Sequence, residues 1–181
     1  ELDHDNDRLF CDLGRRSYGP SGDQDVSIGS HNTITVDGQA PFPLNRAYYD
    51  EAYRTRTARR PPQPKWDGDG VEVKHFGFSR LSGLGAHRRH WRFDGAKLHL
   101  SDELEGSGRH EIIRRFHTTL PVRQTDDGLM IGRYRLSADG QVDVQSTKRW
   151  PEYGTSEPAT VISITSSPRL PWQSVVSVEP Q

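Results

Sequence analysis

Residues 27–39 read Ser-Ile-Gly-Ser-His-Asn-Thr-Ile-Thr-Val-Asp-Gly-Gln, and this stretch decides how the chain folds. From residue 31 to residue 36 the side chains alternate in character, which is the period of a β-strand with one buried face. We expect the even-numbered residues to face the core, while the odd-numbered ones, beginning with His31, lie on the polar face. Most of this run is β-branched, which suits a pleated sheet. Asp37-Gly38 then ends it with a tight-turn dipeptide.

The same organisation recurs along the chain. Short β-rich runs are punctuated by Asp-Gly dipeptides that begin at Asp37, Asp67, Asp69, Asp94, Asp127 and Asp139. No helical run separates them, so βαβ units are not expected. We therefore predict an all-β fold: a large two-sheet antiparallel β-sandwich with a long irregular loop near residues 41–66, forming a single domain over residues 1–181. Strands are expected at residues 9–13, 71–79, 86–93, 96–100, 111–120, 129–136, 141–144, 160–165 and 174–178, after a frayed start over residues 1–9.

Composition narrows the classes of function. The formal net charge of -1 gives no basis for a nucleic-acid partner. No apolar run is long enough to span a bilayer, so no membrane partner is expected either. The single cysteine, Cys11, excludes an internal disulfide and is best interpreted as a small buried hydrophobe. The 4 Trp, 6 Tyr and 6 Phe, in a chain that is only 31% hydrophobic, fit β-sheets with broad polar faces.

The loop predicted near residues 41–66 combines cations with aromatic rings. Between residues 46 and 60, five Arg occur with two acidic residues, and three Tyr are interleaved. Because Arg binds carboxylate or sulfate in a bidentate manner and aromatic rings stack on sugar faces, this mixture suits an acidic polysaccharide. Tyr48, Arg54 and Arg56 are the candidate substrate-binding residues here. A solvated loop, or an interface with another domain of the same protein, explains the composition equally well.

An ordered set of short motifs spans nearly the whole chain. They are Asp12-Leu13-Gly14-Arg15-Arg16-Ser17-Tyr18-Gly19, the stretch at residues 30–39, Ala86-His87-Arg88-Arg89-His90-Trp91-Arg92-Phe93, Asp102-Glu103-Leu104-Glu105-Gly106, Arg115-Phe116-His117, and Tyr153-Gly154 followed by Pro158-Ala159. In this order and spacing, the chain resembles the C-terminal β-sheet domain of the heparinase II/III-like polysaccharide lyase family. The resemblance implies that the chain is the C-terminal part of a larger protein, which combines a helical toroid with this β-sheet domain.

The resemblance also implies an activity. Members of the family cleave anionic polysaccharides that contain uronic acid by β-elimination, in a cleft shared by the toroid and the β-sheet domain. His31 matches the histidine that the β-sheet domain contributes; an imidazole with a pKa of about 6.5 can donate to the substrate carboxylate or move a proton. Asn32 is a candidate for substrate binding beside it. The expected partners are an anionic polysaccharide and the toroid of the same protein, and the resemblance implies a periplasmic or secreted bacterial protein.

No cofactor is required for such a reaction, but some members of the family hold a metal in this domain through His and Asp side chains. A structural metal such as zinc or calcium would find candidate ligands here in Asp50, His87 and His90. Two features count against this site. At an i, i+3 spacing on a strand, the two histidines point to opposite faces, and Thr33 stands two positions after His31, where such members place a ligand. Ordinary strand histidines are the competing interpretation.

Two functions stay open on the sequence. The first is a lyase domain that contributes His31 to a shared cleft. The isolated chain is then expected to be inactive, because nothing in it resembles the long amphipathic helices of a toroid and a lone His without positioned partners gains little. The second is a non-catalytic β-sandwich that binds carbohydrate or braces a partner domain. No Ser lies in a Gly-x-Ser-x-Gly elbow and no phosphate-binding loop is present, which removes those two chemistries.

Overall fold

The structure is a computed structural model that describes residues 1–17, 27–43, 52, 61–126 and 128–181. These residues form an all-β sandwich, as predicted. The strands are β1 (Leu2–His4), β2 (Asp7–Phe10), β3 (Ile34–Val36), β4 (Gln63–Trp66), β5 (Gly70–His75), β6 (Leu84–Asp94), β7 (Lys97–Gly106), β8 (Ile112–Thr118), β9 (Val122–Thr125), β10 (Gly128–Ile131), β11 (Tyr134–Ala138), β12 (Gln141–Glu152), β13 (Thr155–Ser166) and β14 (Trp172–Pro180). Two short 3-10 helices are also present in the described residues, η2 (Ile28–Ser30) and η3 (Gly77–Arg80). None of the helices in the described ranges has the length and apolar character needed to cross a membrane.

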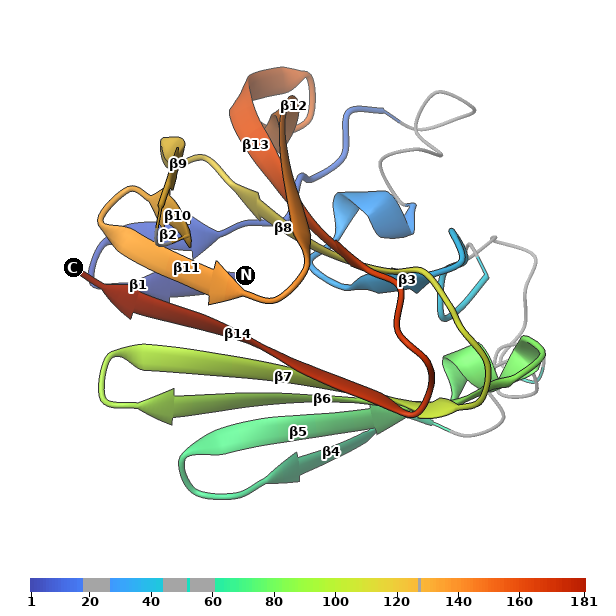
Figure 1. Cartoon of the computed structure of the whole chain (residues 1–181). Coiled ribbons are helices and arrows are strands. Elements are labelled where there is room, and N and C mark those ends of the chain that lie inside the picture. Colours follow the sequence, from blue (N-terminus) through green and yellow to red (C-terminus); the bar gives the residue numbers. More distant parts are fainter. Residues whose placement is uncertain (18–26, 44–51, 53–60, 127) are drawn as a thin grey trace.

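Two antiparallel sheets face each other as the layers of the sandwich (Figure 1). The larger sheet has the order β4-β5-β6-β7-β14-β11-β10-β9, and the smaller has the order β12-β13-β8-β3. Apolar side chains from both layers fill the space between them. Phe116 and Ile162 of the smaller sheet lie in one cluster with Leu98, Leu136 and Val176 of the larger. Each is 4% exposed or less, so this cluster joins the two layers, and a second buried cluster forms around Ile34, Phe78 and Leu104.

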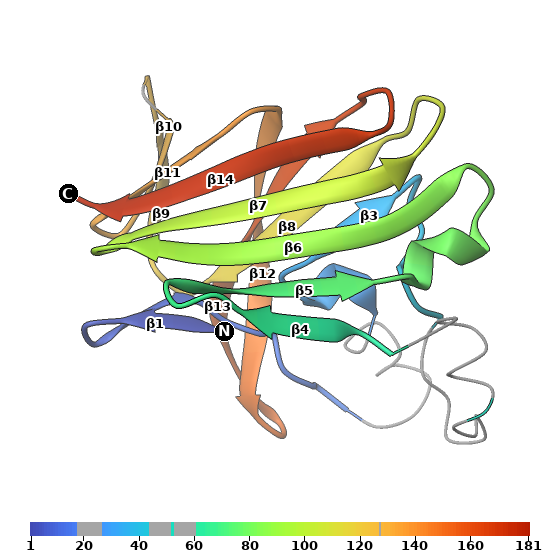
Figure 2. The same cartoon turned by 90° about the horizontal axis from the view of Figure 1, so that it is seen from below.

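The β6–β7 hairpin is the part of the larger sheet that follows most directly from the sequence. Its strands run side by side in Figure 2 and pair through the Asp94-Gly95 turn. Gly95 takes a φ of 58° there, a conformation that glycine adopts without a Cβ clash. Leu98 and Leu100 are buried together, as their shared face predicts.

Several segments differ from the expectation, and three of them have a clear structural reason. Residues 1–9 belong to the β1–β2 hairpin rather than to a frayed start, because Leu9 inserts into the core. The predicted strand at residues 129–136 is two strands, β10 and β11, since Gly132 turns the chain with a φ of 58°. Gln63–Trp66 forms β4 inside the segment predicted as an irregular loop, because it pairs with β5.

The stretch around His31 also folds differently from the prediction. Strand β3 begins only at Ile34, and the residues just before it bend after η2 instead of extending the strand. Pairing with β8 starts at Ile34↔Arg114, which sets the boundary. Before that point the side chain of Asn32 forms hydrogen bonds with the backbone of Cys11 and of His117, and these bonds hold the bend in place. His31 therefore lies in a bend that leads into β3 (the His31 bend), not on the polar face of a strand.

Candidate functional site

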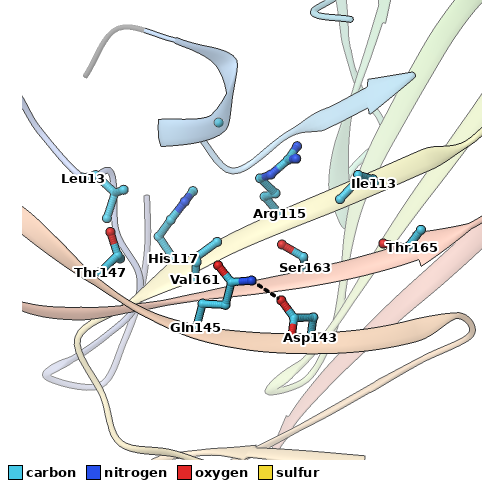
Figure 3. A pocket seen from close by; sticks show the side chains of 11 residues that line it. Leu13, Ile113, Arg115, His117, Asp143, Gln145, Thr147, Val161, Ser163 and Thr165 are labelled. Atoms are coloured by element: carbon cyan, nitrogen blue, oxygen red, sulfur yellow. Dashed lines mark hydrogen bonds between the residues drawn. The ribbon is translucent and has the colours of Figure 1, made fainter. Parts of the chain in front are cut away.

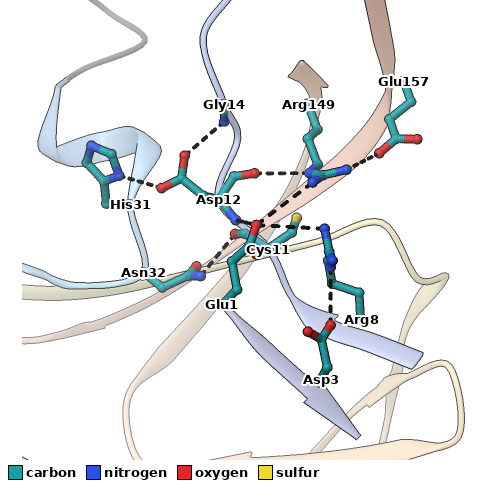
Figure 4. Close-up of polar contacts among 10 residues, drawn as sticks. All are labelled: Glu1, Asp3, Arg8, Cys11, Asp12, Gly14, His31, Asn32, Arg149 and Glu157. Atoms are coloured by element: carbon teal, nitrogen blue, oxygen red, sulfur yellow. Dashed lines mark hydrogen bonds and ion pairs between the residues drawn. The ribbon is translucent and has the colours of Figure 1, made fainter. Parts of the chain in front are cut away.

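His31 forms a close pair with Asp12 beside the smaller sheet (Figure 4). Nδ1 of His31 lies 2.6 Å from Oδ2 of Asp12, a distance typical of a charge-assisted hydrogen bond. Because a carboxylate only accepts, Nδ1 carries the proton and donates it, and Nε2 is the ring nitrogen turned away from Asp12. Both side chains are 42% exposed, so the pair is open to solvent.

The pair changes the proton affinity of both groups. The hydrogen bond from His31 lowers the pKa of Asp12, against the opposing effect of partial burial. The hydrogen bond to Asp12 raises the pKa of His31, again against desolvation. His31 therefore keeps its proton to a higher pH than a free imidazole does, and this favours a role as a cationic hydrogen-bond donor.

Asp12 is itself held from two sides. Its Oδ1 accepts a hydrogen bond of 2.9 Å from the backbone N–H of Gly14, and its carbonyl accepts one of 3.1 Å from Nε of Arg149 (Figure 4). The turn requires glycine at position 14, because φ is +72° and a Cβ there would clash with the carbonyl oxygen of Trp150. The carboxylate thus has a fixed place before it meets His31.

Asn32 uses its side-chain amide within the protein. Nδ2 donates to the carbonyl of Cys11 at 3.0 Å. Oδ1 accepts from the backbone N–H of His117 at 2.8 Å and from its ring Nδ1 at 3.0 Å. Burial lowers the pKa of His117 to about 4, so its ring is neutral near pH 7 and one nitrogen carries the proton that is donated. Asn32 therefore ties the His31 bend to β8 and to the segment that carries Asp12.

A buried ion pair of the larger sheet supports the same bend from the core side. Nε and Nη2 of Arg89 lie 2.7 and 2.9 Å from the two carboxylate oxygens of Asp102, which is 0% exposed. Burial opposes ionisation of Asp102, but Arg89 and His87 together hold its pKa far below the usual value. The remaining terminal nitrogen of Arg89, Nη1, donates to the carbonyl of Asn32 at 2.7 Å. One guanidinium thus joins the larger sheet to the residue next to His31.

The structure separates the two histidines proposed as metal ligands. His87 faces the interior, where Nδ1 is 2.9 Å from Nε2 of His75 and Nε2 is 2.8 Å from Asp102. Nε2 of His90 lies 3.0 Å from Oδ2 of Asp67 instead. Among the residues that the structure describes, no group of three or more His, Cys, Asp or Glu side chains is placed to hold a metal ion.

The remaining candidates from the sequence, Tyr48, Arg54, Arg56 and Asp50, lie outside the described residues. The described site is therefore the Asp12–His31 pair and the groups that hold it. Chemically it presents one solvent-accessible imidazole with raised proton affinity. Such a group is suited to donate to an anionic oxygen or to pass on a proton.

Comparison with known proteins gives this site its setting. The chain matches the family model described as "Heparinase II/III-like, C-terminal" over residues 1–177. The chain belongs to the heparinase II/III-like family. A search of curated proteins finds no match.

Solved heparinase structures share the fold of this heparinase II/III-like chain. A heparinase III with methylated lysines has a TM-score of 0.61 and 15% identity, covering 96% of this chain and 28% of that one. A mutant of the heparan sulfate lyase HepC from Pedobacter heparinus has a TM-score of 0.60 and 11% identity, covering 92% and 27%. Another heparinase III has a TM-score of 0.59 and 17% identity, covering 94% and 27%. The likeness shows the fold, and this chain spans little more than a quarter of those proteins.

Three residues that build the site lie within the heparinase II/III-like motifs, yet sequence reasoning assigned them no role. For Asp12 a signal exists: Gly14 follows two positions later, which is typical of an Asx turn that fixes a carboxylate. For His117 and Arg89 the only signal is a polar residue within a β-rich run. Their partners are set by the fold and not by neighbours in the sequence.

Proposed function

We propose that this chain is the β-sheet domain of a polysaccharide lyase that acts by β-elimination on an anionic polysaccharide containing uronic acid. It contributes His31 to a cleft that a helical toroid of the same protein completes. Membership of the heparinase II/III-like family supports the reaction class, as does the fold shared with a heparan sulfate lyase. The observation that carries the proposal is the Asp12–His31 pair, which leaves Nε2 directed away from its carboxylate partner.

The reaction explains why such a pair is useful. β-Elimination removes the proton on C5 of a uronate and breaks the bond to the oxygen on C4. Negative charge builds on the uronate carboxylate as the proton leaves, so a cation placed at that carboxylate lowers the barrier. His31 fits this role, because Asp12 fixes its Nδ1 and raises its pKa while Nε2 remains to donate. In this proposal the toroid supplies the base for the C5 proton and the acid for the leaving oxygen.

The test is His31→Ala in the whole protein, defined here as this domain together with its toroid. The matched control is His110→Ala, since His110 also pairs with a carboxylate, Asp37, at 2.7 Å. Turnover is followed by the ultraviolet absorbance of the conjugated double bond that elimination creates. We expect His31→Ala to lower kcat by about 100-fold or more. The stability of the variant should change little, because an exposed ion pair contributes no more than about 1 kcal/mol to stability. The control should keep normal turnover.

Other outcomes lead to other conclusions. Near-normal turnover of the His31→Ala protein rejects the catalytic role. Tight binding of acidic oligosaccharides by a whole protein that cleaves none of them favours the non-catalytic carbohydrate-binding sandwich. The 181-residue chain alone should not cleave polysaccharide, because it lacks the groups assigned to the toroid.

A further inference from the structure

A pocket of about 370 Å³ lies on the outer face of the smaller sheet (Figure 3). This volume is at the small end of the range for ligand sites. Strand register builds its floor: Arg115 on β8, Ser163 on β13 and Asp143 on β12 are direct partners, so their side chains form one row on one face. The next row on that face is His117, Val161 and Gln145.

The row carries opposite charges at its two ends. The guanidinium of Arg115 donates to the hydroxyl of Thr35 at 3.0 Å, and no carboxylate of the described residues lies within ion-pair distance of it. At the other end, Asp143 accepts from Nε2 of Gln145 at 2.7 Å and likewise meets no cation in this part of the structure. Two strand spacings separate the ends by roughly 10 Å, with the hydroxyl of Ser163 between them. The pocket therefore offers an anion-binding end and a hydroxyl-binding end.

The pocket adjoins the Asp12–His31 pair. Gly29, two residues before His31, and Leu13, next to Asp12, both line it. The backbone N–H of Arg115 donates to the carbonyl of Thr33 at 3.0 Å, so β8 carries the pocket floor and anchors the His31 bend at once. A polysaccharide that reaches His31 would therefore extend across the pocket.

We propose that this pocket is a second carbohydrate subsite, which binds another uronate unit of the polysaccharide whose reacting unit lies at His31. Arg115 binds the carboxylate of that unit, because a guanidinium matches two carboxylate oxygens. Ser163 and Asp143 bind its ring hydroxyls, for which a carboxylate is a strong acceptor. The assignment of the neighbouring reacting unit rests on the lyase function proposed above.

The experiment measures binding and turnover separately. A tetrasaccharide prepared from heparan sulfate is titrated into the 15N-labelled 181-residue chain, in parallel with the same tetrasaccharide after reduction of its carboxyl groups to alcohols. The variants are Arg115→Met, which removes the cation, and Ser163→Leu, which fills the pocket. The matched control is Arg123→Met on β9, an exposed arginine of the larger sheet. KM and kcat are measured on heparan sulfate with the same variants of the whole protein.

We expect the backbone amides of Ser163 and Gln145 to shift on titration. Arg115→Met should weaken binding by about 10- to 100-fold, the effect of losing a hydrogen bond to a charged group. Reduction of the carboxyl groups should weaken it at least as much, because reduction also removes the carboxylate at His31. With the reduced tetrasaccharide, Arg115→Met should cause no further loss, because the contact that Arg115 makes is already gone. In the whole protein, Arg115→Met and Ser163→Leu should raise KM more than they lower kcat, and Arg123→Met should change neither.

Three results would overturn this subsite. They are amides that do not shift at millimolar tetrasaccharide, effects of Arg115→Met and carboxyl reduction that multiply, and an unchanged KM in both pocket variants. These results are distinct from failure of the lyase proposal. A whole protein that binds the tetrasaccharide through Arg115 but cleaves no anionic polysaccharide retains the pocket and loses the proposed reaction.

Discussion

Replacing Arg89 by Met should break the buried ion pair that supports the His31 bend. Arg89 is 5% exposed, and the substitution leaves the fully buried Asp102 with His87 as its remaining hydrogen-bond partner among the described residues. Removing one member of a buried pair costs about 3–5 kcal/mol. Whole domains are stable by about 5–15 kcal/mol, so a large share of the total is at stake. At about 2–4 °C per kcal/mol for a chain of this length, Tm should fall by about 6–20 °C.

The assay is urea and thermal unfolding followed by circular dichroism, with two companion variants. Arg89→Met combined with Asp102→Asn removes the buried charge but keeps an acceptor for His87, and it should recover at least half of the loss. Arg114→Met is the control, because Arg114 is 1% exposed, bonds through Nη2 to the carbonyl of Asp139, and has no carboxylate in ion-pair distance within the described ranges. It should cost less than about 1 kcal/mol, since an apolar side chain replaces a buried charge that no carboxylate of the described residues neutralises.

Hydrogen exchange connects this stability to the site. The amide of Thr33 donates to the carbonyl of His31 at 2.9 Å. It should exchange faster in Arg89→Met and normally in Arg114→Met, because Arg89 holds the carbonyl of Asn32 and Arg114 does not. A loss of less than about 1 kcal/mol in Arg89→Met, or a double variant as unstable as the single one, would contradict the stabilising role of the ion pair.

Three further predictions follow from the site. Asp12→Asn should bring the pKa of His31 down toward its ordinary value, measured by NMR titration of the ring protons; an unchanged pKa would contradict the pairing. The pKa of His117 is about 4 in the folded chain, against about 6.5 when unfolded. The contribution of His117 to the free energy of unfolding is therefore complete above about pH 6.5, and roughly 3 kcal/mol of it is lost as the pH falls toward 4. Urea midpoints that stay flat between pH 7 and 4 would contradict this. Gly14→Ala should destabilise by more than Gly38→Ala, because both residues have positive φ but only the Cβ at position 14 meets backbone; equal unfolding midpoints would remove the clash argument.

The fold class could be predicted because its signals are local. Alternation and Asp-Gly turns are properties of a few neighbouring residues, and the β6–β7 hairpin follows them from His87 onward, past a register shift between Leu84 and His87. The extent of β3 could not be predicted in this way. Its pattern begins at His31, but the strand begins at Ile34, because Asn32 binds the backbone of Cys11 and His117, which lie 21 and 85 residues away.

The candidate site likewise combines a residue that the sequence indicates with contacts that only the fold creates. His31 was identified through motif resemblance, and the structure adds Asp12 at a separation of 19 residues. Arg89 reaches the carbonyl of Asn32 across 57 residues and from the other sheet. Contacts of this kind depend on which strands become neighbours, and no local period in the sequence encodes them. The pocket floor could not be predicted from the sequence for the same reason. Its row of Arg115, Ser163 and Asp143 joins residues of β8, β13 and β12 that only the completed sheet aligns.

The way the Asp12 segment is fastened also dictates when the site can exist during synthesis. The backbone N–H of Cys11 donates to the carbonyl of His117 at 2.9 Å, and the carbonyl of Leu13 accepts from the N–H of Trp150 at 2.7 Å. A nascent chain therefore carries this segment long before its anchors have been translated. Hairpins such as β6–β7 can form early, whereas pairings this distant are slow, with folding typically in milliseconds to seconds for β-sandwiches. We expect the site to be assembled late. It is then present only in chains that have finished folding, and a collapsed intermediate has none of its function.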